Sequence, residues 1–213
     1  MRIVLAPDPH VLMLSELRTA CASLATQSSS GIKAVVLDFN PANQLTEHGS
    51  QDTIKHPSAI GEQASAAIRA IPQPVLAVAR ATLSKTASML IQAADFTLVA
   101  EDARLIVSGQ AGEEDTLTGA QAVRLRQVTW SAPAGDLNKH MERILDLLRA
   151  KSAVALRLAK ASVNLAAAKH ASHLEALRQV NEFYLSQVMQ THDAQEGLQA
   201  FLQKRKPNFS GKR

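Results

Sequence analysis

The chain has 213 residues, of which 46% are hydrophobic, 20% are charged and 3% are aromatic, and its formal net charge is +4. This length and composition predict a globular protein with one main domain and an appended subdomain. The single cysteine, Cys21, excludes an internal disulfide framework and a cysteine-rich metal site. No apolar run approaches the roughly 20 residues that cross a bilayer, and no signal-peptide pattern opens the chain, so we expect a cytoplasmic protein without a membrane partner.

Much of the positive charge lies in the last ten residues, which contain five lysines and arginines. Few aromatic residues accompany this cluster, so a solvated tail is favoured and a nucleic-acid partner is not expected. A phosphate-bearing small molecule stays open as a ligand.

The first third of the chain predicts strands that alternate with helices. Residues 1–9 form an edge strand closed by a Pro-Asp-Pro turn, and residues 32–39 form a mostly apolar strand. A helix over residues 60–71 follows, with Ala64, Ala67, Ile68 and Ile71 facing inward. Between the two strands, a helix is indicated by apolar residues that recur at helical spacing: Leu12, Leu14, Leu17, Ala20 and Leu24.

The segment 72–107 reads as strand, turn, helix, strand. Val75–Ala79 has no polar alternation, which is typical of a parallel strand buried on both faces. The turn 80–84 leads into a helix over 85–94 that begins with small residues, and the strand 95–100 follows. Small residues at a helix start leave backbone N–H groups open to a ligand oxygen. This geometry indicates a binding site for an anion or a carbonyl oxygen.

The last third predicts helices over residues 137–148 and 174–189, with further helical segments at 152–160 and 191–207. In the segment 191–207, Asp193 is expected to cap a helix that contains Glu196, and Gly197 to permit close packing.

These segments resemble signatures of the crotonase (enoyl-CoA hydratase/isomerase) family. Residues 72–107 resemble K-P-x-I-A-A-V-x-G-x-A-x-G-G-G-x-E-L-A-L-x-C-D-x-x-I-A, and residues 191–207 match D-x-x-E-G-x-x-A-F-x-x-K-R-x-P. The resemblance implies an α/β fold of the ClpP/crotonase type. It places a crotonase-like ββα spiral core over residues 1–135, shortened after residue 109, and a C-terminal helical trimerisation subdomain over residues 136–213.

The resemblance also implies an oxyanion hole made by two backbone N–H groups, those of Asn43 and Thr86. Such donors stabilise the oxyanion of a polarised thioester. The two glutamates of the family are replaced, because Met89 and Gly109 stand at their positions. An ordinary turn capped by its own side chains is the competing reading of the same residues.

Glu47 and Lys85 are the candidate substitutes for the missing acid/base groups, and Lys204 is a candidate contact for a coenzyme A phosphate. A lysine in the first turn of a helix usually points into water, and for Lys204 a solvated side chain is the favoured alternative. The histidines show no metal-ligand spacing, so no metal site is expected. Further acid/base candidates are His48, His56, Glu113, Glu114 and Asp115.

Two functions follow from this reading. The first is an acyl-CoA enzyme of crotonase type, which is a hydratase (a lyase), an isomerase or a thioester-processing relative. It needs no cofactor beyond the coenzyme A of its substrate. The second is a catalytically inactive subunit that binds acyl-CoA or a partner. A homotrimer or dimer of trimers, with or without a paralogous subunit, is implied by family likeness, and cyclohexa-1,5-dienecarbonyl-CoA hydratases are the most similar subfamily.

Overall fold

The computed structural model describes residues 1–26, 32–41, 57–108, 114–167 and 173–211. Contacts within the chain divide it into two units. The sheet unit comprises Met1–Ser28, Ala34–Ile71 and Val75–Ile144, and the C-terminal unit comprises Ser29–Lys33, Pro72–Pro74 and Leu145–Arg213.

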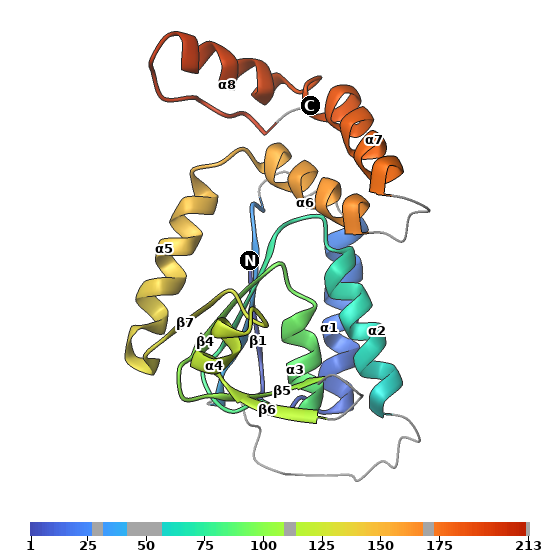
Figure 1. The fold of residues 1–213 in the computed structure, drawn as a ribbon, viewed down its shortest axis with the longest axis vertical. Coiled ribbons are helices and arrows are strands. Elements are labelled where there is room, and N and C mark those ends of the chain that lie inside the picture. The colour runs from blue at the N-terminus through green and yellow to red at the C-terminus, as the bar shows by residue number, and fades with distance from the viewer. Residues whose placement is uncertain (27–31, 42–56, 109–113, 168–172, 212–213) are drawn as a thin grey trace. The chain divides into compact units, whose positions relative to one another are not determined.

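A five-stranded parallel sheet in the order β1-β2-β3-β4-β7 is the centre of the sheet unit (Figure 1). Its strands β2 and β3 are buried at every residue, which confirms the doubly covered strand predicted for Val75–Ala79. As predicted, the first strand lies at the sheet edge. The strands of this sheet are β1 (Arg2–Leu5), β2 (Val35–Phe39), β3 (Val75–Ala79), β4 (Phe96–Ala100) and β7 (Trp130–Ala132).

Three helices of the sheet unit lie side by side on one side of the sheet (Figure 1). They are α1 (Val11–Thr26), α2 (Pro57–Ala70) and α3 (Lys85–Gln92). In α1 the leucines at 14, 17 and 24 are buried as the spacing predicts, but Leu12 is 64% exposed. The inward face of α1 begins at Met13 instead, because its buried positions 13, 14, 17, 21 and 24 follow the helical period.

An antiparallel hairpin of β5 (Arg104–Ser108) and β6 (Glu114–Thr118) forms a second sheet, and α4 (Gly119–Arg124) follows it directly. The sequence reading did not predict β6. Thr118 starts α4 with a capping box, in which its hydroxyl accepts from the N–H of Gln121 at 3.3 Å and the Gln121 side chain accepts from the N–H of Thr118 at 2.9 Å. A short 3-10 turn, η2 (Ala134–Asp136), precedes α5 (Leu137–Arg149).

The C-terminal unit is helical, as predicted. It contains α6 (Ala153–Ala167), α7 (His173–Phe183), a π-helical turn η3 (Tyr184–Val188) and α8 (His192–Leu202). The predicted helix over 174–189 therefore ends in a π turn. Lys160 of α6 is buried and donates to the backbone carbonyl of Gln73 at 3.2 Å.

Candidate functional site

The N-terminus of α3 is held in place by backbone and side-chain hydrogen bonds of Ser84, its N-cap. The N–H of Ser84 donates to the carbonyl of Pro7 at 3.0 Å, and its Oγ accepts from the N–H of Ala87 at 3.3 Å. The carbonyl of Ser84 accepts from the N–H of Ser88 at 2.9 Å. The helix start is therefore capped by its own serine, which the sequence signal of a serine before a helix could have indicated.

The backbone N–H of Thr86 stays unused by this cap. Among the described residues it donates no hydrogen bond, and the residue is half-buried. Since the N-terminal N–H groups of a helix carry partial positive charge, this group is a donor for a carbonyl or anionic oxygen. Its predicted partner donor, Asn43, lies outside the described residues.

The side chains of Thr86 and Met89 face α2. A Cβ added at Gly61 of α2 would lie 3.4 Å from Cγ2 of Thr86 and 3.9 Å from Cε of Met89. Both side chains therefore pack next to Gly61, where an added Cβ would make ordinary contacts with them, and the thioether of Met89 cannot transfer a proton. Gly109, at the second replaced position, lies outside the described residues.

A buried carboxylate lies near the carboxyl ends of β2 and β3. Asp38 of β2 is fully buried, and Oδ1 accepts from Nε of Arg80 at 2.7 Å while Oδ2 accepts from Nη2 of Arg80 at 3.1 Å. Arg2 of β1 makes a third contact, to Oδ2. Two arginines against one carboxylate leave an excess of positive charge at this place, and the fork of Arg80 is occupied by Asp38.

Sequence reasoning missed this ion pair. A lone aspartate inside an apolar strand and an arginine directly after the next strand were the available signal, because neighbouring parallel strands bring such residues to one edge.

The other predicted acid/base residues are spread over the unit. Lys85 is exposed at the first position of α3, and Asp115 is exposed on β6 opposite Val107. Glu114 lies on β6 opposite Ser108. Within the described ranges no group of three or more His, Cys, Asp or Glu could hold a metal ion, and no helix is long and apolar enough to cross a membrane. Glu47, His48, His56 and Glu113 lie outside the described residues.

In the C-terminal unit, Lys204 follows α8 in a left-handed conformation with φ of 53°. The N–H of Lys204 donates to the carbonyl of Phe201 at 3.2 Å, and the N–H of Arg205 donates to that of Ala200 at 3.0 Å. This pair of bonds is a Schellman motif, in which glycine usually takes the position of Lys204. The side chain of Lys204 is exposed.

The prediction that Asp193 caps α8 is wrong. Thr191 is the N-cap, and its Oγ1 accepts from the N–H of Ala194 at 3.1 Å. Thr191 directly precedes the first residue of α8, so its hydroxyl lies within reach of the free N–H groups of the first helical turn. Gly197 is also not needed for close packing, because the nearest atom to an added Cβ, Cε1 of Phe209, would lie 4.0 Å away.

Asp193 instead holds two distant segments of the C-terminal unit. It is buried and accepts hydrogen bonds from the hydroxyl of Ser152, from the hydroxyl and N–H of Ser210, and from the N–H of Gly211. Burial raises the pKa of Asp193, but these hydrogen bonds, that of Ser152 foremost, outweigh burial and bring the pKa below its ordinary value.

Glu196 holds the same C-terminal segment from one turn further along α8. Its Oε1 accepts from Nη1 of Arg205 at 2.5 Å and from the N–H of Asn208 at 2.7 Å. The hydrogen bond from Arg205, followed by that of Asn208, lowers the pKa of Glu196 to about 2.

Comparison with known proteins gives matches at the level of structure. No protein-family profile and no curated protein matches the sequence. The chain is similar to an enoyl-CoA hydratase from Bacillus anthracis, with a TM-score of 0.76 at 20% identity over 99% of this chain and 95% of the other. An enoyl-CoA hydratase/isomerase from Mycobacterium paratuberculosis gives 0.75 at 18% over 99% and 94%. An enoyl-CoA hydratase from Mycobacterium smegmatis gives 0.70 at 22% over 92% and 88%.

These likenesses extend over almost the whole length of each solved chain, although fewer than a quarter of the residues are identical. They agree with the α/β architecture that the sequence motifs predict, including the helices after the sheet unit. The chain therefore has the crotonase fold, the fold of enoyl-CoA hydratase/isomerase family members.

Proposed function

We propose that the chain binds an acyl-CoA thioester and that the N–H of Thr86 donates to the thioester carbonyl oxygen. The observation that carries this proposal is that N–H itself, which the Ser84 cap leaves without a partner among the described residues. It lies in the first turn of α3, which follows the carboxyl end of the central parallel strand β3, where ligands bind in open α/β sheets. The fold, shared with proteins named enoyl-CoA hydratases, supports a thioester as the ligand.

In this proposal Asn43 supplies the second N–H, and Lys204 contacts a phosphate of coenzyme A. A preorganised N–H aimed at a developing oxyanion lowers the reaction barrier. In enzymes from which one such donor was removed, the barrier rose by about 2.7–4 kcal/mol. For a bound thioester, whose oxygen carries less charge, a single hydrogen bond contributes about 0.5–1.5 kcal/mol. Coenzyme A enters as part of the ligand.

Binding is better supported than turnover. Hydration of an enoyl thioester needs one group to activate water and another to exchange a proton at the α-carbon. Neither Met89 nor Gly109 can do this. Of the two predicted substitutes, Lys85 and Glu47, only Lys85 lies within the described residues, and it is exposed. Turnover would therefore rest on Lys85 and Glu47 acting from positions that the family glutamates do not occupy.

Calorimetry with two ligands tests the role of the Thr86 N–H. Butyryl-CoA has the thioester carbonyl, whereas S-butyl-CoA is a thioether without it, so the protein should bind the thioester roughly 2- to 10-fold more tightly. Thr86→Pro removes the N–H at a position of the first helical turn where proline is tolerated, and it should abolish that preference. Thr86→Ala keeps the N–H and should preserve it.

Equal affinity of the wild-type chain for both ligands would contradict the Thr86 contact, and no binding of either would remove the acyl-CoA proposal. Turnover is measured separately with crotonyl-CoA and a cyclic dienoyl-CoA. Activity above that of Lys85→Ala and Glu47→Gln variants would establish an enzyme that uses these residues. Turnover equal in all three proteins would exclude a role for these two residues, and no turnover above the uncatalysed rate would leave a binding protein.

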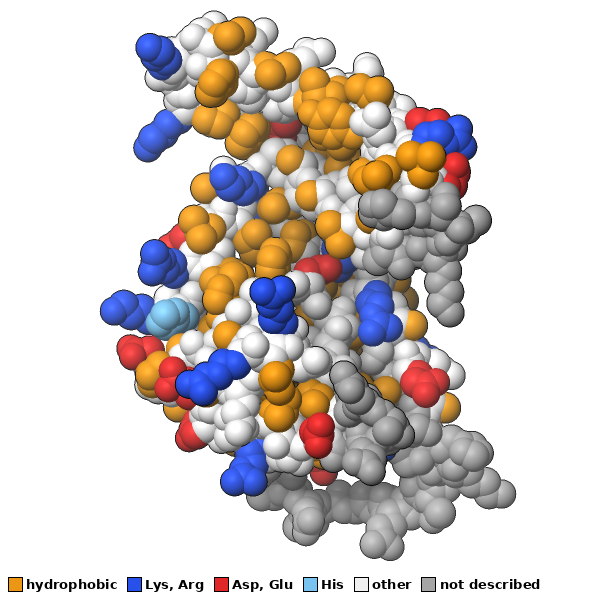
Figure 2. All heavy atoms as spheres, viewed as in Figure 1, with side chains coloured by type: hydrophobic (Ala, Val, Ile, Leu, Met, Phe, Trp, Pro, Cys, Tyr) orange, Lys and Arg blue, Asp and Glu red, His pale blue; other side chains and the backbone are white. Residues whose placement is uncertain are grey.

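A second candidate function is that of an oligomeric subunit with a structural role. The observation that favours it is the apolar surface of α7, η3 and α8, where hydrophobic side chains gather in the C-terminal unit (Figure 2). Phe201 and Leu202 are 80% and 78% exposed, which is costly for a chain that stays monomeric. The other exposed residues of this surface are Leu174, Leu177, Tyr184, Leu185 and Leu198.

Light scattering on the purified chain tests this candidate. We expect an oligomer that Phe201→Glu and Leu202→Glu convert to monomers, because each places a charge in the apolar contact. A wild-type monomer at micromolar concentration would contradict the subunit role.

A further inference from the structure

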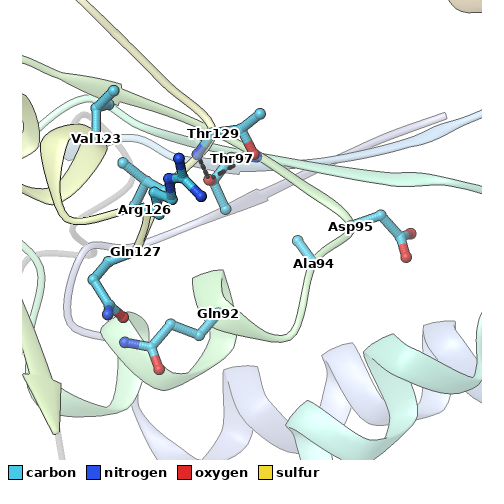
Figure 3. A pocket seen from close by; sticks show the side chains of 9 residues that line it. Gln92, Ala94, Asp95, Thr97, Val123, Arg126, Gln127 and Thr129 are labelled. Carbon is cyan, nitrogen blue, oxygen red and sulfur yellow. Dashed lines mark hydrogen bonds between the residues drawn. The ribbon is translucent and has the colours of Figure 1, made fainter. Parts of the chain in front are cut away.

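A pocket of about 580 Å³ lies at the C-terminal end of α3, whereas Thr86 lies at its N-terminal end. Its lining comes from the end of α3, the start of β4 and the segment between α4 and β7 (Figure 3). This volume falls within the roughly 300–1,000 Å³ of small-molecule sites. The lining is mainly polar, so the pocket suits a polar ligand.

Arg126 enters this pocket from a strained backbone position. It follows α4 with φ of 56°, and the N–H of Arg126 donates to the carbonyl of Val123 at 3.0 Å while that of Gln127 donates to Ala122 at 2.8 Å. These two bonds form a Schellman motif, whose left-handed position is usually glycine. An arginine there is less favourable than glycine for the backbone, and strained non-glycine residues concentrate at functional sites.

The guanidinium of Arg126 has no hydrogen bond to the residues that the structure describes, and it points toward Thr97 across the pocket (Figure 3). The carboxylate of Asp95 also lines the pocket but points away from Arg126 (Figure 3). Its Oδ2 accepts from the N–H of Val75 at 2.7 Å. Arg126 is thus a cationic group that a ligand in this pocket could contact, and a guanidinium fork matches the two oxygens of a carboxylate.

A hydroxyl donor faces the same space. Thr97 and Thr129 join through their hydroxyls at 3.2 Å, and each hydroxyl oxygen also accepts a backbone N–H from the other residue, at 2.6 and 3.1 Å. The pair has two hydroxyl protons and uses one between the two oxygens, so the other proton is left to donate. Because Thr97 is buried and Thr129 is exposed, Thr129 presents this donor outward.

We infer that this pocket binds a small polar carboxylate. Arg126 takes the carboxylate through its guanidinium, the Thr97–Thr129 hydroxyl pair donates to it, and the carboxamides of Gln92 and Gln127, which also line the pocket, bond the hydroxyl or amino groups of the ligand. The inference does not depend on the acyl-CoA proposal, because the two sites lie at opposite ends of α3.

Calorimetry of the full chain with L-malate tests the inference, and two-dimensional NMR locates the binding. We expect saturable binding with shifts of the Thr97 and Thr129 amides. Arg126→Gly should weaken L-malate at least roughly tenfold, because it removes a charge-assisted bond pair, and should raise the melting temperature, because glycine fits the turn. A loss of binding in a more stable protein cannot be attributed to unfolding.

Arg124→Gln is the matched control, since Arg124 carries the same charge two residues away but does not line the pocket. It should leave L-malate binding unchanged, and an equal loss would overturn the inference as nonspecific charge attraction. Inorganic phosphate is the comparison anion, and glycerol the uncharged one. Tighter binding of phosphate would overturn the carboxylate class. Absence of L-malate binding at millimolar concentration, or binding by glycerol alone, would overturn the site.

Discussion

The hydroxyl of Ser152, directly before α6, donates to Oδ2 of Asp193 in α8 at 2.5 Å across 41 residues of sequence. Because the remaining acceptor sites of this buried carboxylate are taken by Ser210 and Gly211, three segments of the C-terminal unit depend on one negative charge.

Asp193→Asn should lower the free energy of unfolding by about 2–3 kcal/mol near pH 7. The mutation replaces one carboxylate oxygen, which accepts hydrogen bonds, by an NH₂ group that faces other donors and leaves them without an acceptor. The measurement is urea unfolding followed by circular dichroism. Asp146→Asn is the control: this carboxylate pairs with Arg149 at 2.7 Å in solvent and should change stability by less than about 0.5 kcal/mol.

The contribution of Asp193 should also depend on pH. Its pKa is lower in the folded state than its ordinary value of 3.8, so the folded chain binds fewer protons than the unfolded chain. The stabilisation is therefore complete above the unfolded pKa and is lost as the pH falls through it toward the folded pKa. Unfolding curves between pH 7 and 2 should show a smaller loss for Asp193→Asn than for the wild type. An unchanged loss would contradict the role given to Asp193.

Glu196 should titrate near pH 2 in NMR spectra of its side-chain carbonyl carbon. Arg205→Gln removes the strongest of the hydrogen bonds that favour the charged form, so the pKa of Glu196 should move up toward its ordinary value of 4.5. Lys206→Gln keeps the pair and should leave the titration in place. A Glu196 pKa that ignores Arg205→Gln would contradict the contact.

Gly119 cannot be replaced without moving the backbone. An added Cβ would lie 2.2 Å from the carbonyl oxygen of Ala100 and 3.1 Å from Cγ1 of Val99. Gly119→Ala should therefore destabilise the sheet unit by roughly 3 kcal/mol or more, which thermal unfolding would detect. At Gly135 nothing lies within 4 Å of an added Cβ, so Gly135→Ala should leave the melting temperature nearly unchanged.

Lys204→Gly should stabilise the chain by roughly 0.5–1 kcal/mol, because glycine adopts the left-handed conformation of the Schellman motif without strain. Lys204→Ala keeps the strain and should bring no such gain in chemical unfolding. The same glycine variant tests the proposed phosphate contact, since unchanged affinity for coenzyme A would contradict it.

The elements with strong local patterns could be predicted from the sequence. The five apolar residues Val75–Ala79, bounded by prolines and a polar turn, indicated a buried strand, and the helical period around Leu14 and Leu17 indicated α1. The hairpin strand β6 was missed because its acidic start, Glu114 and Asp115, is depleted in strands, and it forms only through its pairing with β5. The three-residue β7 is too short to show a period.

At the candidate site, sequence pattern gave the helix start but not its hydrogen bonds. The motif identified α3 and the small residues that open it. Which N–H groups of its first turn stay free for a ligand depends on which of them donates to the Ser84 hydroxyl, and the motif does not specify this. The buried pair of Asp38 and Arg80 joins residues 42 positions apart, and no local pattern encodes such a contact. The strain at Arg126 is likewise a property of the folded turn.

The packing of Met89 against α2 bears on how a carboxylate could be accommodated at this position. A glutamate at position 89 would place its carboxylate in the half-buried contact with α2, next to Gly61. Met89→Glu alone would therefore add a charge to a helix contact before it supplied a proton acceptor. A proton acceptor at position 89 therefore requires changes in α2 and α3 together.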